Sequence, residues 1–197
     1  TGGGELLLTL GHPYELTSVT EGWEPNLALC QKKLAPLGIT VKYYDSEKGV
    51  PLPFPDDSFD LVIDRHESYD LSEVRRVLKK NGFFVTQQVG GENDLPLVKR
   101  LCQGFSGSFV GFNLENELPR FRQAGFRVMR SDQAYVESRY LDVGAVVFQA
   151  SVCPWEYPGF SVETSQEALF QMQAQVESLG FVPNLEHRFL IVAKNRK

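Results

Sequence analysis

Strand-like and helix-like segments alternate through the first ninety residues, and this alternation limits the folds open to the chain. β-Branched and aromatic runs predict strands, and segments bounded by proline, glycine or turn residues predict helices. The predicted strands are 16–20, 39–44, 59–64 and 83–89, and the predicted helices are 5–10, 24–37 and 71–80. Alternation of this kind predicts an α/β fold with a mostly parallel, doubly wound sheet and a ligand site at the carboxyl ends of the strands.

The pattern is looser after residue 89. Helices are predicted at 95–103, 115–124 and 165–179, with a strand starting at 125 and a closing strand at 187–193. The apolar segment 142–153 fits a buried helix or a strand, and periodicity does not separate the two.

A glycine loop and an acid are the first candidate site. Gly2, Gly3 and Gly4 precede a short predicted helix, and Glu21 ends the strand that follows. Glycines let the backbone approach a ligand closely, and a carboxylate at the tip of the next strand accepts hydrogen bonds from ribose hydroxyls. Asp45 and Asp64 end two further strands, so all these groups are expected at one edge of the sheet.

The loop does not match the common phosphate-binding patterns. Three consecutive glycines followed by Glu5 give neither G-x-G-x-x-G nor the P-loop sequence. A carboxylate beside the loop suits pyrophosphate badly, whereas it tolerates the positive sulfonium of S-adenosylmethionine.

Composition indicates an ordinary globular protein. The 197 residues are 42% hydrophobic and 23% charged, with a net charge of −5, which does not favour nucleic acid as a partner. Cys30, Cys102 and Cys153 are widely spaced, which indicates reduced thiols and a cytoplasmic protein. The three histidines are far apart, so no metal site is expected, and no segment resembles a membrane span.

Three segments resemble class I S-adenosylmethionine-dependent methyltransferases, in particular the small-molecule methyltransferase type 11 group. They are the loop Thr1-Gly2-Gly3-Gly4-Glu5, the run from Pro53 to Val62, and the run from Leu71 to Phe84. The resemblance covers about residues 1–136 and 187–197. It implies a Rossmann-like fold of three layers with an antiparallel last strand, and S-adenosyl-L-methionine as the cofactor. The family's N-terminal part and first strand have no counterpart here, so we expect an N-terminally incomplete domain.

The resemblance also assigns roles to individual residues. It places Arg65 and His66 near the methyl-bearing end of the cofactor, and His66 and Glu67 are the candidate acid–base residues. The residues implied to bind the cofactor are Gly2, Gly3, Gly4, Glu21, Gly22, Trp23, Asp45, Ser46 and Arg65.

We therefore expect one domain over residues 1–197, with 137–185 as an insert that covers the substrate. Its candidate substrate-binding aromatics are Tyr140, Trp155 and Tyr157. The alternative for this segment is a packing extension or the surface of a homodimer. The predicted activity is methyl transfer to a small-molecule acceptor. An RNA methyltransferase and a non-catalytic adenosyl-binding or interaction protein remain open as alternatives.

Overall fold

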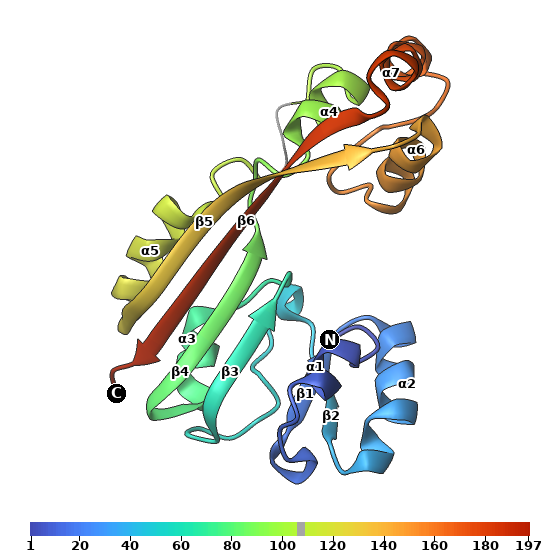
Figure 1. Ribbon diagram of the computed structural model, residues 1–197. Helices are drawn as coiled ribbons and strands as arrows, with labels where there is room; N and C mark the ends of the chain where they lie inside the picture. The colour runs from blue at the N-terminus through green and yellow to red at the C-terminus, as the bar shows by residue number, and fades with distance from the viewer. Residues whose placement is uncertain (106–108) are drawn as a thin grey trace. The chain divides into compact units, whose positions relative to one another are not determined.

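The computed structural model describes residues 1–105 and 109–197 and divides the chain into two compact units (Figure 1). Unit 1 comprises Thr1–Thr86, Gln123–Arg127 and Ala193–Lys197, and unit 2 comprises Gln87–Arg122 and Val128–Val192. The helices are α1 (Glu5–Thr9), α2 (Glu24–Lys33), α3 (Leu71–Val77), α4 (Leu95–Leu101), α5 (Leu114–Gln123), α6 (Val143–Val152) and α7 (Gln166–Leu179). The strands are β1 (Ser18–Glu21), β2 (Thr40–Tyr43), β3 (Phe59–Arg65), β4 (Leu78–Val89), β5 (Phe126–Tyr140) and β6 (Val182–Asn195).

In unit 1, β1 and β2 form a parallel pair in which Glu21 lies opposite Tyr43. The buried side chains between these strands and α2 form a small apolar core of Val19, Cys30, Leu34 and Ile39. The predicted helix over 24–37 is present as α2 followed by a short 3-10 helix, and it ends at Gly38, whose φ of 96° suits glycine.

Helix α3 ends three residues earlier than predicted. The prediction extended it to Lys80, but β4 begins at Leu78. The backbone amides of Asp57 and Ser58 donate hydrogen bonds to the carbonyls of Arg76 and Val77, at 3.1 and 2.8 Å. These partners come from a loop about twenty residues away, so the local sequence gives no sign of them.

The remaining strands form a second sheet with the order β3-β4-β6-β5. Strand β6 is antiparallel to β4, because Asn195 contacts the Leu78 carbonyl while the Gly90 amide donates to His187 (Figure 1). The antiparallel last strand is thus confirmed. The predicted single sheet is found as two, because side-chain alternation within a strand does not reveal which strands it pairs with.

Unit 2 has its own apolar core. It is built from side chains of α4, α6 and α7 together with Val182 at the start of β6. The segment whose type was left open is helix α6, and Asp142 caps it by accepting a hydrogen bond from the Ala145 amide at 2.8 Å. Strands β5 and β6 extend into both ends of the predicted insert, so its middle consists of α6, α7 and the connection between them.

None of the helices in the described ranges is long and apolar enough to cross a membrane. Within the same ranges, no group of three or more His, Cys, Asp or Glu side chains could hold a metal ion.

Candidate functional site

The glycine loop and Glu21 lie together in unit 1, as predicted. One carboxylate oxygen of Glu21, Oε2, accepts hydrogen bonds from the Gly2 amide at 3.1 Å and from the Thr1 amino nitrogen at 3.0 Å. Among the described residues, the other oxygen, Oε1, accepts from the Trp23 amide alone, at 3.3 Å. A carboxylate has about four acceptor positions, so these three donors leave Glu21 with about one for a hydroxyl.

Glu21 stays ionised although it is 7% exposed. Burial raises its pKa, whereas hydrogen bonds, including those from the amides of Trp23 and Gly2, lower it, and the net pKa is lowered. The site therefore presents a carboxylate at neutral pH.

Two glycines are required where the backbone comes close to other atoms. A Cβ on Gly22 would lie 2.8 Å from the carbonyl oxygen of Tyr44, and a Cβ on Gly4 would lie 2.7 Å from the Leu34 side chain. Gly4 also has a φ of 80°. The loop is fixed to α2 by the Cys30 thiol, which donates to the Gly2 carbonyl at 3.1 Å. Burial raises the pKa of this thiol, so it remains a donor.

Asp45 lies beside Gly22, at the carboxyl end of β2. Its carboxylate accepts a hydrogen bond from the Glu47 amide at 3.1 Å and pairs with Lys48 at 3.4 Å. Part of its capacity is therefore used in the local turn. Trp23, next to Gly22, has a 62% exposed side chain. The pairing of β1 with β2 thus brings Glu21, Gly22 and Asp45 to one edge.

The loop after β3 lies next to the loop after β2, because the hydroxyls of Ser46 and Ser68 hydrogen-bond to each other. Arg65 ends β3, and His66 and Glu67 follow it in this loop. All three are exposed, and His66 has a φ of 57°. The Ser68 amide donates to Glu67 Oε1 at 2.9 Å. Asp64, one residue before Arg65, accepts a hydrogen bond from the Thr86 hydroxyl at 3.2 Å.

The three aromatics proposed for substrate binding lie in unit 2 and have different environments. Trp155 is 57% exposed and Tyr140 is half-buried, whereas Tyr157 is 2% exposed and donates to Asp94 Oδ2 at 3.2 Å. Burial, and then the charge of Asp94, raises the pKa of Tyr140 to about 12. Tyr157 is therefore a hydrogen-bond donor to a buried acid. The sequence pattern did not indicate this role.

That acid belongs to a polar cluster that sequence reasoning missed. Asn184 Nδ2 donates to Asp94 Oδ1 at 2.6 Å, and Asn93 Nδ2 donates to Glu156 Oε1 at 3.1 Å. Burial, followed by the negative charge of Asp94, raises the pKa of Glu156 to about 7. The cluster joins residues that are 63 to 90 positions apart in the chain. The only local signal is Asn93-Asp94 directly before a predicted helix.

Comparison with known proteins identifies the fold of this arrangement. Residues 1–86 match the family model described as a methyltransferase domain. No curated protein sequence matches the chain. Among solved structures, the chain is similar to the YcgJ protein of Bacillus subtilis, with a TM-score of 0.62 and 17% identity over 100% of this chain and 89% of that one.

Two further structures show the same likeness. An S-adenosylmethionine-dependent methyltransferase of Methanosarcina mazei has a TM-score of 0.58 and 16% identity over 99% of this chain and 89% of that one. A geranyl diphosphate methyltransferase, solved with its substrate and sinefungin, has a TM-score of 0.56 and 12% identity over 98% of this chain and 69% of that one. At these identities the likeness shows the Rossmann-like fold.

Proposed function

We propose that this chain transfers the methyl group of S-adenosylmethionine to a small-molecule acceptor. Residues 1–86 match the methyltransferase domain family model, which describes an enzyme class that uses S-adenosylmethionine. The observation that carries the proposal is Glu21, a buried carboxylate held by a glycine-loop amide beside Gly22 and Asp45. The proposed fold is the doubly wound, three-layer form of the α/β class.

The residues around Glu21 fit the adenosyl part of this cofactor. Glu21 keeps acceptor capacity for a ribose hydroxyl, and the missing side chains of Gly22 and Gly4 let backbone approach closely. The exposed ring of Trp23 offers a flat apolar surface to adenine. Asp45 and Ser46 border the same place, and Gly2 and Gly3 are proposed to line the methionine end.

When bound, the cofactor supplies a methyl group on a sulfonium that is already electrophilic. The chain's own task is to hold the acceptor atom in line with that methyl and to exclude water. His66 or Glu67 is proposed to take a proton where the acceptor loses one, and Arg65 is proposed to lie near the reacting end. Tyr140 and Trp155 are proposed for the acceptor side, with 137–185 as the covering segment, whereas the buried Tyr157 donates to Asp94 instead.

A small-molecule acceptor is favoured over RNA by two observations. The net charge is −5, whereas phosphate backbones are bound by basic surfaces. The structurally similar geranyl diphosphate methyltransferase acts on a small molecule, according to its description.

The test is transfer of label from methyl-labelled S-adenosylmethionine, offered in parallel with a small-metabolite extract and with total RNA. Label is expected in the metabolite fraction, and it should fall with Glu21→Ala but not with the exposed control Glu24→Gln. Label in RNA would show that the acceptor is RNA and not a small molecule. Cofactor binding with no transfer in either arm would favour the non-catalytic alternative.

A further inference from the structure

A pocket lies in unit 1, at the amino end of β3, whereas His66 and Glu67 follow the carboxyl end of that strand. Its volume is about 320 Å³, within the range of sites for small organic molecules. Its lining combines the loop before β3, helix α3, the end of α5 and the residues after β6: Asp56, Ser72, Arg75, Arg76, Ala124 and Lys197. No sequence motif marked it, because its walls come from four separate segments.

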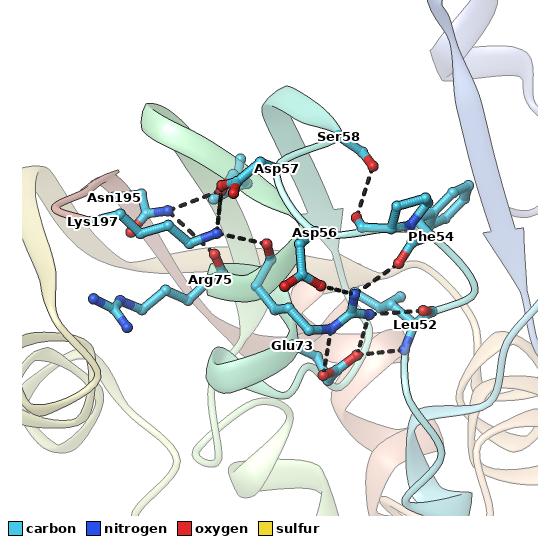
Figure 2. A network of polar contacts seen from close by, with 12 residues as sticks. Leu52, Phe54, Asp56, Asp57, Ser58, Glu73, Arg75, Asn195 and Lys197 are labelled. Carbon is cyan, nitrogen blue, oxygen red and sulfur yellow. Dashed lines mark hydrogen bonds and ion pairs between the residues drawn. The ribbon is translucent and has the colours of Figure 1, made fainter.

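The guanidinium of Arg76 is fully used by the protein (Figure 2). Its five N–H groups have five acceptors at 2.7–2.9 Å: the two carboxylate oxygens of Glu73, Asp56, and the carbonyls of Leu52 and Phe54. An arginine side chain has five donors in all. Arg76 therefore fastens the loop before β3 to α3 and has no donor left for a ligand.

Lys197 is occupied in the same way. Its three N–H groups contact Asp57 and the carbonyls of Arg76 and Leu78 at 2.7–2.9 Å. Asn195 Nδ2 lies 3.1–3.3 Å from the carbonyls of Arg75, Leu78 and Lys79. The carbonyls at the end of α3 are thus satisfied without a contribution from the side chain of Arg75.

Arg75 is the remaining cation of the pocket. Its Nε is buried and has no acceptor among the described residues, and its guanidinium makes no ion pair with them. Figure 2 shows this guanidinium pointing away from Glu73 and from Asp56. It is positioned against Gly125, where a Cβ would lie only 2.9 Å from Nε. The acids nearby, Asp56 and Asp57, already pair with Arg76 and Lys197.

From these contacts we infer that the pocket is a binding site for a small organic carboxylate, held by Arg75. A guanidinium with free donors matches the two oxygens of one carboxylate in a bidentate pair. A phosphate dianion fits less well, because only one cation has donors left and the Asp56 carboxylate also lines the pocket. Ala124 supplies an apolar wall for the rest of the acid. This site is separate from methyl transfer and does not depend on the proposed function.

The test is a nuclear magnetic resonance titration of the ¹⁵N-labelled chain with sodium propionate. The probe signals are the Arg75 Nε–Hε group and the backbone amide of Gly125, and sodium chloride at equal ionic strength is the reference. Saturable shifts in the millimolar range are expected with propionate, and weaker ones with sodium phosphate.

Three variants separate this site from general charge effects. Arg75→Gln should abolish the Gly125 response, and Arg75→Lys should weaken it at least fivefold, because a lysine lacks the paired donors. The exposed control Lys80→Gln removes one positive charge nearby and should leave the response unchanged. Equal shifts with chloride, an unchanged response in Arg75→Gln, or tighter binding of phosphate than of propionate would each overturn the inference.

Discussion

The two units bury acidic side chains in different ways. In unit 1, Glu21 is held by amides from the glycine loop and from Trp23, and it keeps acceptor capacity free. In unit 2, Asp94 is 3% exposed and receives donors from Tyr157 and Asn184, which lie 63 and 90 residues away in the chain. A buried acid with spare capacity suits ligand binding, whereas one satisfied by distant side chains suits stabilisation of a fold.

The largest expected effect comes from removing the acid of unit 2. Asp94→Ala leaves the Tyr157 hydroxyl buried without an acceptor and removes one of the two acceptors of the Asn184 amide, which keeps Ser138. The free energy of unfolding should therefore fall by about 2–5 kcal/mol. Urea denaturation followed by far-UV circular dichroism measures this loss. The matched control Asp132→Ala, which removes an exposed paired acid, should change stability by less than about 1 kcal/mol. A loss no larger than the control's would show that the cluster does not stabilise the fold.

The next effect is a pH dependence confined to the unit 2 cluster. The pKa of Glu156 is raised to about 7 from an ordinary value of 4.5, by burial and then by Asp94. The folded state therefore binds the Glu156 proton more tightly than the unfolded state does. The resulting contribution to the free energy of unfolding is complete below about pH 4.5 and is lost as the pH rises through 7. The free energy of unfolding falls by up to about 3 kcal/mol over this range.

Glu156→Gln should remove this dependence, because the amide does not titrate. Comparing the free energies of unfolding of the two proteins at pH 5 and pH 8 isolates the contribution of Glu156 from the other carboxylates. Equal pH slopes in the two proteins would contradict the assignment. The neighbours that face Glu156 are Asn93, Asp94 and Arg188. Because the charge of Arg188 lowers the pKa of Glu156, both proteins in this comparison should keep Arg188.

A smaller effect tests the close approach of backbone in unit 1. Gly22→Ala places a methyl group 2.8 Å from the Tyr44 carbonyl, so β1 and β2 must shift, at a cost of about 1–3 kcal/mol. In the same region, the three atoms nearest to a Cβ on Gly3 all belong to the Glu5 side chain, which can move, so Gly3→Ala should cost less. Thermal unfolding of the two variants gives the difference. Equal losses would mean that the β1–β2 contact is more adaptable than the structure implies.

Sequence predicted the contiguous features of this chain better than those that distant segments build. The strands over 39–44 and 59–64 and the pairing of Glu21 with the glycine loop were predicted from contiguous patterns, because propensity and turn residues act locally. The end of α3 and the cluster around Asp94 were missed, because their partners come from distant segments. The break between the two sheets was missed for the same reason, since strand pairing is decided by long-range contacts.

Calorimetric titration with S-adenosylhomocysteine tests most directly the proposal that Glu21 holds the adenosyl part of S-adenosylmethionine. Glu21→Gln retains the size of the side chain but loses the charge, and it should weaken binding by about 1.5–3 kcal/mol, or roughly 10- to 150-fold. Glu24→Gln, an exposed acid in the first turn of α2, should bind like the unchanged protein. Equal affinity with and without the Glu21 carboxylate would contradict the claim.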